Sequence, residues 1–423
     1  MSRHDADVII IGAGPAGSSI AIRLAQAGWR AVVVEQSPFP RHKVCGECLG
    51  PASLELLDEL GIGERLRDTA GPEIRRVGWM TRSHTIIADM PPCSAGRHRY
   101  GFAIGRDLLD ALLLERAREL GVRVIQPARV REIRGAPGAY TCNYLYTCEQ
   151  QLRSTGERHL LCNTDETIAS AIVVDAHGSW ERGPAADGAD EAGPERARQR
   201  PSDLFAFKAS FQNATLSPGL LAILSFPGGY GGMVVADRGR TTVACCIQRD
   251  ALRAWRADAR GKPAGAVIDA RLRRICRGVA ASLEGARREN GWYAVGPLRT
   301  GFHVYSANGL LPVGNSGMEA HPLIGEGMCI ALQSAALLAQ LLGSKCERFD
   351  GCRYRAVQQR YANACRARFA RRLYLAQLYA QVAMCRPIAA SATAVMRAWP
   401  RALTRAARLA GKANPGAPVP RQR

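Results

Sequence analysis

Three glycines and one carboxylate near the start of the chain stand at a spacing that suits a particular kind of ligand. Gly12, Gly14 and Gly17 form the pattern GxGxxG, and Glu35 follows eighteen residues after Gly17. Gly12 permits a tight turn, Gly14 lets the backbone approach a pyrophosphate, and Gly17 lets a helix pack closely on a strand. The helix start, which includes Ala16, offers N–H groups to the diphosphate, and Glu35 can accept hydrogen bonds from ribose hydroxyls. The pattern predicts a dinucleotide site.

The elements that must position these residues can be read from the same stretch. DVIIIGAGPAGSSIAIRLAQAGWRAVVVE reads as a buried strand, a turn, a helix closed by Gly28, and a second strand that ends at Glu35. This is a Rossmann-type unit of about thirty residues. It does not distinguish FAD from NAD, because both carry the same adenosine diphosphate.

A second segment favours FAD. In GLLPVGNSGMEAHPLIGEGMCIALQSAALLAQLL an apolar strand is followed by a bend and then by a long apolar helix. An amide at the end of this strand can hydrogen-bond a ribityl hydroxyl, and the helix start can direct N–H groups at the pyrimidine edge of a flavin. The cofactor-binding residues predicted here are Asn315, Pro322, Gly325, Gly327 and Met328.

Four stretches give the chain a family resemblance: IIIGAGPAGS, KVCGE, GRDLLDALLLERARELGV and VGNSGMEAHPLIGEGM. Over roughly residues 5 to 345 it resembles the FAD-dependent oxidoreductases with a glutathione-reductase-type FAD fold. These include aromatic hydroxylases, flavin halogenases and geranylgeranyl reductases. The resemblance implies that Arg106 contacts the flavin and that the backbone of Val130 contacts the adenine. Asn315 stands where the family usually has Asp, and an amide keeps an acceptor for the ribityl chain.

Two departures from the family pattern concern the substrate and the reductant. Geranylgeranyl reductases carry a Tyr-x-Trp-x-Phe-Pro element, whereas FPGGYGGMVV keeps Tyr230 but has Gly232 in the Trp position, which leaves space in the pocket wall. The second fingerprint reads VVDAHGSWERG, with His177 in place of the acid. A second GxGxxG unit is absent from the sequence, so NADPH or NADH would bind transiently on the flavin domain, or a partner would supply electrons.

Cys45 and Cys48 in RHKVCGECLG allow three interpretations: a redox disulfide, half of a zinc site, or the lining of a flavin pocket. Pyridine-nucleotide disulfide reductases add a nicotinamide domain and a dimerisation domain, which this chain lacks. Zinc needs four ligands, and no second CxxC or His/Cys cluster follows, so no metal is expected. By the family resemblance VCGE is a flavin-facing loop, with Cys45 near the ring as a wall or proton relay. Cys48 is expected to begin the following helix.

The enzymatic interpretation favours an FAD-dependent monooxygenase that hydroxylates or epoxidises an apolar or aromatic small molecule. The alternative is a flavin-dependent reductase of carbon–carbon double bonds. Lesser alternatives are a halogenase, which lacks support because the WxWxIP motif is missing and EIRRVGWM has no Lys, and a dithiol oxidoreductase. His321 is a candidate proton donor with a pKa suited to neutral pH, and Tyr230 is a candidate for orienting the substrate. With Cys45 these are the expected catalytic residues.

Charge is concentrated at the C-terminal end of the chain. The formal net charge is +20, and residues 345–423 hold 17 Lys and Arg against Glu347 and Asp350. An Arg-rich helical region fits an acidic carrier protein or an anionic membrane surface, and the alternative interpretation is a helix packed on its own domain with solvated charges. Nucleic acid is not expected, because no binding module or interleaved aromatic residues accompany the charge. The N-terminus does not read as a signal peptide, so a cytoplasmic location, peripheral to a membrane or not, is expected.

The expected fold class is α/β: a Rossmann-like FAD-binding domain with a parallel sheet, an interleaved substrate domain with an antiparallel sheet, and a helical C-terminal tail. The FAD-binding domain is expected to be discontinuous. The expected ranges are 1–72, 97–178 and 295–345 for the FAD-binding domain, 73–96 and 179–294 for the substrate domain, and 346–423 for the basic helical region.

Overall fold

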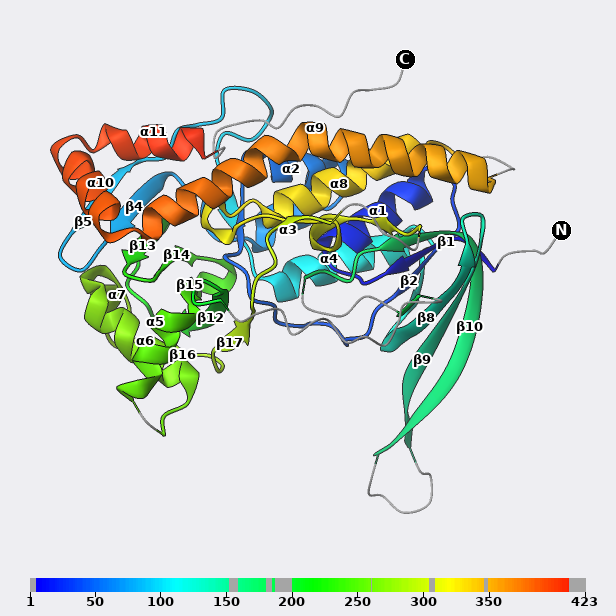
Figure 1. The fold of residues 1–423 in the computed structure, drawn as a ribbon, viewed down its shortest axis with the longest axis horizontal. Helices are drawn as coiled ribbons and strands as arrows, with labels where there is room; N and C mark the ends of the chain where they lie inside the picture. Colours follow the sequence, from blue (N-terminus) through cyan, green and yellow to red (C-terminus); the bar gives the residue numbers. More distant parts are fainter. Residues whose placement is uncertain are drawn as a thin grey trace.

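Two large sheets and the helices around them form most of the computed structural model (Figure 1). The structure describes residues 5–151, 159–179, 185–186, 200–259, 261–303, 309–345 and 349–410. Each sheet has eight strands, and each draws its strands from separate parts of the chain. The expected α/β fold, with a Rossmann-like unit and an interleaved second sheet, is confirmed.

The first sheet, here named the dinucleotide sheet, has the order β11-β8-β9-β10-β1-β2-β7, with β19 paired to β10. Strands β10, β1, β2, β7 and β19 are parallel, whereas β8 and β9 form antiparallel pairs beside them. The apolar strand β1 is buried between β10 and β2, as parallel strands covered on both faces usually are. The bounds are β1 Ala6–Ile11, β2 Ala31–Val34, β7 Arg123–Ile125, β8 Ala128–Ala136, β9 Ala139–Gln151, β10 His159–Asp175, β11 Ala185–Ala186 and β19 Leu311–Pro312.

Helices pack on the dinucleotide sheet and on one another. α1 contacts both α4 and α8, and these helices share the largest apolar core with β1 and β2. α8 reads GMCIALQSAALLAQLL, which is apolar on every face, and a helix of this composition is stable only when it is buried. The bounds are α1 Pro15–Gln26, α2 Pro51–Glu59, α3 Gly63–Thr69, α4 Arg106–Glu119 and α8 Gly327–Leu342.

The second sheet, here named the substrate sheet, has the order β16-β12-β15-β14-β13-β4-β5, with β17 paired to β12. Its pairs are antiparallel apart from the parallel pair β13–β4. Short helices α5, α6 and α7 share an apolar core with one side of this sheet. The bounds are β4 Arg76–Met80, β5 Thr85–Asp89, β12 Leu204–Gln212, β13 Leu220–Phe226, β14 Gly229–Val235, β15 Thr241–Gln248, β16 Arg287–Arg288, β17 Tyr293–Val295, α5 Arg249–Ala257, α6 Ala264–Ile275 and α7 Arg277–Ser282.

The C-terminal region is helical, as expected, and it is packed against the rest of the molecule. α9 (Gly351–Met384) lies along α8 and continues past strands β13 and β14, and Figure 1 shows it crossing the whole molecule. α10 (Arg386–Ala398) and α11 (Arg401–Leu409) return over β4 and β5. Residues 346–348 and 411–423 of the expected tail lie outside the described residues.

Two small pairings complete the fold near the site. β3 (Cys48–Leu49) pairs with β6 (Phe102–Ala103), and β18 (Gly301–Phe302) pairs with β20 (Met318–Glu319). Across the described ranges, no helix combines the length and the apolar composition that crossing a bilayer requires.

Candidate functional site

One large cavity extends from the glycine turn of the dinucleotide sheet to the face of the substrate sheet. Its volume is about 560 Å³. The sequence-predicted site residues that line it are Gly12, Gly14, Ala16, Glu35, Cys45, Arg106, Val130, Tyr230, Asn315, Pro322, Gly325, Gly327 and Met328. Gly17 and His321 do not line the cavity; each lies directly behind a part of its wall.

The glycine turn has the backbone that its sequence predicted. Gly12 has φ +96, and a Cβ there would lie 2.6 Å from the carbonyl oxygen of Ala176, so a larger residue cannot be accommodated. Gly14 is the N-cap of α1, and the first turn of α1 faces the cavity. Gly17 packs against the backbone of Gly12, which brings helix and turn together. The turn therefore exposes helix N–H groups where an anion can bind.

Two arginines stand opposite the start of α1. A Cβ at Gly14 would lie 3.7 Å from Nη2 of Arg106 and 3.8 Å from Nη2 of Arg41. Arg106 is held by two hydrogen bonds of 2.8 Å to the carboxylate of Asp110. The Nε of Arg41 is buried and has no hydrogen-bond partner among the described residues. An unpaired buried donor beside a helix N-terminus fits a ligand with phosphate oxygens. Sequence analysis missed Arg41, although it immediately precedes the HKVCGE stretch.

Glu35 is buried at the end of β2, where the sequence placed it. Its carboxylate accepts hydrogen bonds from the backbone N–H of Ala13 (2.7 Å) and of Ser37 (2.9 Å), and from Arg41 (3.2 Å). A carboxylate has about four acceptor positions, so it can still accept from a ribose hydroxyl. Val130 lies at an irregularity in the β8–β9 pairing and lines the same end of the cavity.

The second predicted segment meets the first. Gly314, in the short 3₁₀ turn Gly314–Ser316, has φ +64, and a Cβ there would lie 2.8 Å from the Cβ of Ala16 in α1. Two segments that are about three hundred residues apart in sequence are therefore in contact at the cavity. Asn315 donates from Nδ2 to Oγ of Ser179 (2.7 Å). The turn Pro322–Ile324 and Gly325, which is left-handed, lead into α8.

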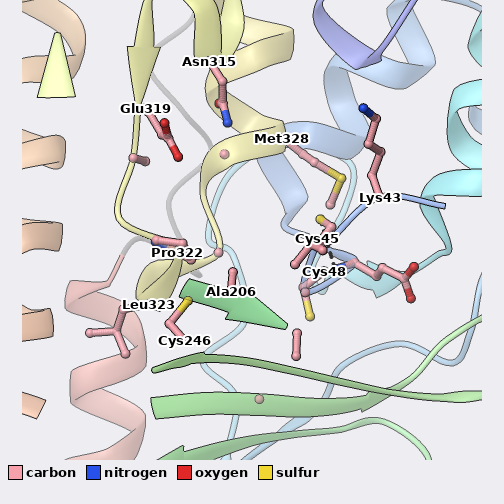
Figure 2. A pocket seen from close by; sticks show the side chains of 18 of the residues that line it. Lys43, Cys45, Cys48, Ala206, Cys246, Asn315, Glu319, Pro322, Leu323 and Met328 are labelled. Atoms are coloured by element: carbon pink, nitrogen blue, oxygen red, sulfur yellow. Dashed lines mark hydrogen bonds between the residues drawn. The ribbon is translucent and has the colours of Figure 1, made fainter. Parts of the chain in front are cut away.

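Figure 2 shows this segment facing the cysteine loop across the cavity. Asn315, Glu319 and Met328 lie on one side, and Lys43 and Cys45 lie on the other. The residues present therefore fit FAD: a diphosphate cradle at the glycine turn, and a separate polar and apolar wall where the isoalloxazine would lie.

Both cysteines of the CGEC stretch lie on the cavity wall. Cys45 packs against the core of the dinucleotide sheet, whereas Cys48 packs against the apolar cluster under β4 and β5. The expectation that Cys48 begins the following helix is wrong: it lies in β3, and α2 begins at Pro51. Pairing with β6 holds Cys48 in an extended conformation, and Pro at a first helical position favours the later start.

Glu47, between these cysteines, anchors the loop to the substrate sheet. Its side chain is buried and forms an ion pair with Lys208 of β12 and a hydrogen bond with Thr242 of β15. It also accepts from the backbone N–H of Arg106 at 3.3 Å. Its φ of 60 is unusual for a residue with a side chain. The motif carried no signal for this role, because its partners lie about 160 and 195 residues further along the chain.

Tyr230 and His321 join the two halves of the site. Oη of Tyr230, on β14, lies 2.8 Å from Nδ1 of His321, in the second segment. Burial lowers the pKa of His321 to about 4, so the near-neutral pKa expected from the sequence is not found. Burial also raises the pKa of Tyr230 well above its ordinary value. At neutral pH both groups are uncharged, which suits a positioning pair better than a titrating proton donor.

Glu319 is a titratable group that sequence analysis did not single out. It is 4% exposed and lines the cavity beside Asn315 and Pro322. Burial raises its pKa to about 7, and contacts with Arg299 and Ser179 offset only part of that rise. The fold thus places a carboxyl group that can hold or release a proton near neutral pH on the wall where the flavin ring is expected.

The far end of the cavity is an apolar chamber. Its floor is the substrate sheet, with Trp79, Ile223 and Gly232 in the lining. Gly232 has space around it, since a Cβ there meets its nearest atom, the carbonyl oxygen of Ala222, at 3.4 Å. Its roof is formed by residues of the last three helices, namely Tyr379, Ala383, Ile388, Ala389, Ala392, Met396, Leu403, Ala406, Ala407, Leu409 and Ala410. The C-terminal helices therefore complete the chamber.

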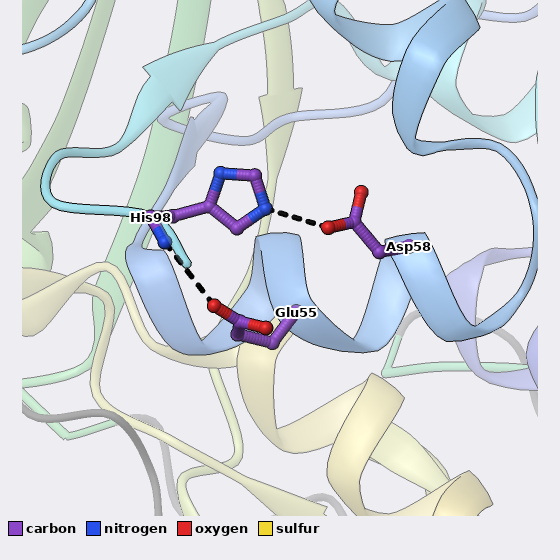
Figure 3. Close-up of side chains that lie close together, drawn as sticks. All are labelled: Glu55, Asp58 and His98. Atoms are coloured by element: carbon purple, nitrogen blue, oxygen red, sulfur yellow. Dashed lines mark hydrogen bonds and ion pairs between the residues drawn. The ribbon is translucent and has the colours of Figure 1, made fainter. Parts of the chain in front are cut away.

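A separate polar cluster lies outside the cavity lining. Glu55 and Asp58 of α2 approach His98, and Nε2 of His98 lies 2.7 Å from the carboxylate of Asp58 (Figure 3). The spacing would suit a cation. Both carboxylates, however, already form ion pairs: Asp58 with Arg67 at 3.0 Å and Glu55 with Arg97 at 3.3 Å. The cluster fastens the loop around His98 to α2.

Most of the chain matches the model of one protein family. The model of a family described as an FAD binding domain matches residues 5–371, which is most of the sequence. The chain belongs to this FAD-binding family. The resemblance drawn from the four motifs is thus confirmed.

Curated relatives match over shorter stretches. The chain is 32% identical over 151 residues to the 1H-pyrrole-2-carbonyl-[peptidyl-carrier protein] chlorinase of Pseudomonas fluorescens, covering 31% of this chain and 33% of that protein. It is 36% identical over 126 residues to the menaquinone reductase of Mycobacterium tuberculosis, covering 29% of each. The matched stretches thus span about a third of these relatives.

Solved structures match over nearly the whole fold. A triple mutant of the flavin-dependent brominase Bmp2 has a TM-score of 0.70 at 17% identity, covering 96% of this chain and 94% of that one. A geranylgeranyl bacteriochlorophyll reductase-like protein from Thermoplasma acidophilum has a TM-score of 0.64 at 18% identity, covering 90% and 87%. At these identities the likeness establishes the fold.

Proposed function

We propose that the protein is an FAD-dependent oxidoreductase that acts on an apolar or aromatic small molecule. The observation that carries the proposal is the single cavity that joins the glycine turn to the apolar chamber. A cofactor that fills the polar end would place its reactive ring at the entrance of the chamber, where a substrate without charges can be bound away from water.

Residues of both segments would hold the cofactor. The start of α1, with Arg41 and Arg106, would bind the diphosphate, and Asn315 would hydrogen-bond the ribityl chain. The wall near Met328 would contact the ring. FAD, once bound, supplies the two-electron redox chemistry, and NADPH or NADH is the proposed source of electrons. All other tasks, namely orientation, exclusion of water and proton transfer, belong to the residues of the chain.

Oxygen insertion into the substrate is the first candidate reaction. The sheet side and the helix side of the chamber are both apolar, so a hydroxylation or an epoxidation would be shielded from bulk water. Gly232 leaves room above β14 for an extended or aromatic carbon skeleton. The Tyr230–His321 pair, uncharged at neutral pH, would help to fix one end of the substrate without an electrostatic cost.

Reduction of a carbon–carbon double bond is the second candidate, and Glu319 favours it. Hydride addition to one carbon requires a proton at the other, and a buried carboxyl group with a pKa of about 7 is suited to deliver it. The similarity to menaquinone reductases and to a geranylgeranyl reductase-like structure supports this candidate. The similarity to halogenases keeps halide-dependent chemistry as a third outcome to test.

The reaction can be decided with purified, FAD-loaded protein. The protein is reduced anaerobically with NADPH or NADH and then mixed with apolar and aromatic substrates, with or without ¹⁸O₂ and with or without chloride or bromide. Incorporation of ¹⁸O into the product would support oxygen insertion. Saturation of an alkene without oxygen would support the reductase, and a product that contains halogen would contradict both. Failure of the folded protein to bind FAD would overturn the proposed class.

The chamber can be tested separately by Gly232→Trp. The indole would fill the space above β14, so we expect kcat/KM to fall at least about tenfold while FAD content stays unchanged. The matched control is Gly291→Trp, at an exposed position outside the cavity lining. Unchanged turnover of every substrate by Gly232→Trp would contradict the assignment of this chamber as the substrate site.

A further inference from the structure

The helices that roof the apolar chamber also present apolar side chains to solvent. On α10 the lining residues Ala389, Ala392 and Met396 form one stripe. Ile388, at the edge of the lining, and Val395, seven residues later, belong to a neighbouring stripe that is exposed to solvent and continues to Trp399. A surface helix of a globular protein normally has one apolar face and one polar face, so a second apolar stripe calls for a partner.

The four large apolar side chains of this stripe and of the end of α11 are each at least two-fifths exposed to solvent. Ile388 is 44% exposed, Val395 55%, Trp399 41% and Leu409, at the end of α11, 73%. The helices themselves are held firmly: Nε1 of Trp79 donates to Thr393 of α10 at 3.0 Å. These apolar side chains are therefore exposed on helices that pack against the rest of the molecule. We name Ile388, Val395, Trp399 and Leu409, with the arginines between them, the α10–α11 surface.

Positive charge surrounds the same surface. Arg397, Arg401, Arg405 and Arg408 are exposed, and no acidic residue occurs in the sequence after Asp350. The guanidinium of Arg405 stacks 4.4 Å above the ring of Trp399. Asp89 of β5, whose carbonyl oxygen accepts from Thr404, is an acidic neighbour from the elements packed below. Arginines in such excess attract an anionic surface.

The cavity opens at this place. Ile388 and Leu409 both line the cavity and are exposed to solvent, so they mark a mouth between α10 and α11. An apolar molecule that entered here would pass from the surface contacted by these helices directly into the chamber. Figure 1 shows α10 and α11 together at one end of the molecule, on the opposite side of the substrate sheet from α5, α6 and α7.

We propose that the α10–α11 surface docks on an anionic lipid membrane and that an apolar substrate enters the chamber from that membrane. Docking would be interfacial, because α10 has 13 residues and is too short to span a bilayer. The apolar side chains would enter the acyl boundary, Trp399 would lie at the headgroup level, and the arginines would contact lipid phosphates. The part of this proposal that concerns substrate entry depends on the proposed function; the docking itself does not.

Two other occupants fit less well. A second copy of this chain, paired face to face, would bring both sets of arginines together, and like charges oppose such an interface. An acidic carrier protein would satisfy the arginines, but it would leave four large apolar side chains facing a charged partner. A membrane satisfies both features at once.

The test is flotation of the full-length, FAD-loaded protein with vesicles of phosphatidylcholine alone or mixed with phosphatidylglycerol. We expect binding to the anionic vesicles, weakened by salt. Val395→Ser/Trp399→Ser should reduce partitioning at least about tenfold, and Arg401→Gln/Arg405→Gln/Arg408→Gln should do the same. The matched control, Arg274→Gln/Arg277→Gln/Arg287→Gln, changes the charge equally at exposed positions of α6, α7 and β16 and should bind like the unaltered protein.

Three results would overturn the docking proposal. The first is no flotation with anionic vesicles, and the second is equal loss in the control variant. The third is a dimer in light scattering, or a complex with an acidic carrier protein, that Val395→Ser/Trp399→Ser abolishes while vesicle binding persists. The flavin absorbance of each preparation is recorded in parallel, so a failure of the proposed function would show as lost FAD rather than as lost flotation.

Discussion

Glu319 is a residue whose protonation depends on the fold. In an unfolded chain its carboxyl group would titrate near 4.5, whereas burial raises its pKa to about 7 in the folded protein. Between these values the folded state binds more protons than the unfolded state, so stability that is present at low pH is lost as pH rises through this window. The position thus carries a stability cost at neutral pH, which is common for functional groups.

Glu319→Gln should remove that cost. We expect the free energy of unfolding of the variant, relative to the unaltered protein, to rise by about 2 kcal/mol between pH 5 and pH 8, because one pKa unit corresponds to about 1.4 kcal/mol. Urea unfolding at both pH values measures this difference. A difference between the two proteins that does not change with pH would show that Glu319 is ionised normally.

Other residue positions differ in how well the sequence could predict them. Gly12, Gly14 and Glu35 were predictable, because a turn, a helix start and a strand end follow from neighbours within about thirty residues. Arg41 and Glu319 were not, because their importance depends on burial and on neighbours from other elements. For His321 the residue type suggested a near-neutral pKa, but the surrounding packing decides the value.

At the scale of elements, the loop that carries CGEC is fastened to the substrate sheet by a buried charge pair. Glu47 of the loop and Lys208 of β12 are both fully buried, and Thr242 of β15 adds a hydrogen bond. Nearby, Nη2 of Arg240, which directly precedes β15, donates to Asp107 of α4 at 2.7 Å. This is a second ionic link between the substrate sheet and the helices of the dinucleotide sheet. Removing one member of a buried pair leaves an uncompensated charge.

Lys208→Met should therefore destabilise the protein strongly, by about 3–5 kcal/mol in the free energy of unfolding. Glu47→Gln/Lys208→Met should cost clearly less than the sum of the two single variants, because the double variant removes both charges. Urea unfolding of the three variants measures the coupling. Arg65→Met is the control, since it breaks an exposed pair with Glu119 and should leave the free energy of unfolding nearly unchanged. Additive effects of Glu47→Gln and Lys208→Met would argue against the anchor.

These links between distant elements explain why the sequence predicted the helices and strands but not the contacts between them. Strand β1, helix α1 and helix α8 have local patterns that predict them. The C-terminal helices were also predicted as helices, but their apolar residues gave no indication that they roof a chamber. That role depends on where β4 and β5 lie, and sequence periodicity does not encode such a distance.

At the scale of the whole molecule, the site exists because two distant segments touch at Gly314 and Ala16. Gly314→Ala would place a methyl group 2.8 Å from the Cβ of Ala16 in α1, at a positive φ that alanine adopts poorly. We expect the variant to lose FAD and to unfold at lower urea concentration, measured by the ratio of flavin to protein absorbance and by a urea titration. Gly291→Ala, where space is open, is the control and should retain both. Full FAD occupancy in Gly314→Ala would contradict the convergence of the two segments on one cofactor.

Helix α9 restricts how the two large sheets can move relative to each other. Contacts hold it at several points along its length. The hydroxyl of Tyr361 donates to the carbonyl of Pro312 at 3.0 Å, and Arg372 donates to Gln333 of α8 at 2.8 Å. Further along, Tyr379 and Ala383 line the chamber. Because α9 contacts α8 as well as β13 and β14 of the substrate sheet, it opposes a hinge motion between the two sheets. We therefore do not expect a substrate to enter by a hinge opening between the dinucleotide sheet and the substrate sheet. Exchange would instead take place through the mouth between α10 and α11, where Ile388 and Leu409 both line the cavity and are exposed to solvent.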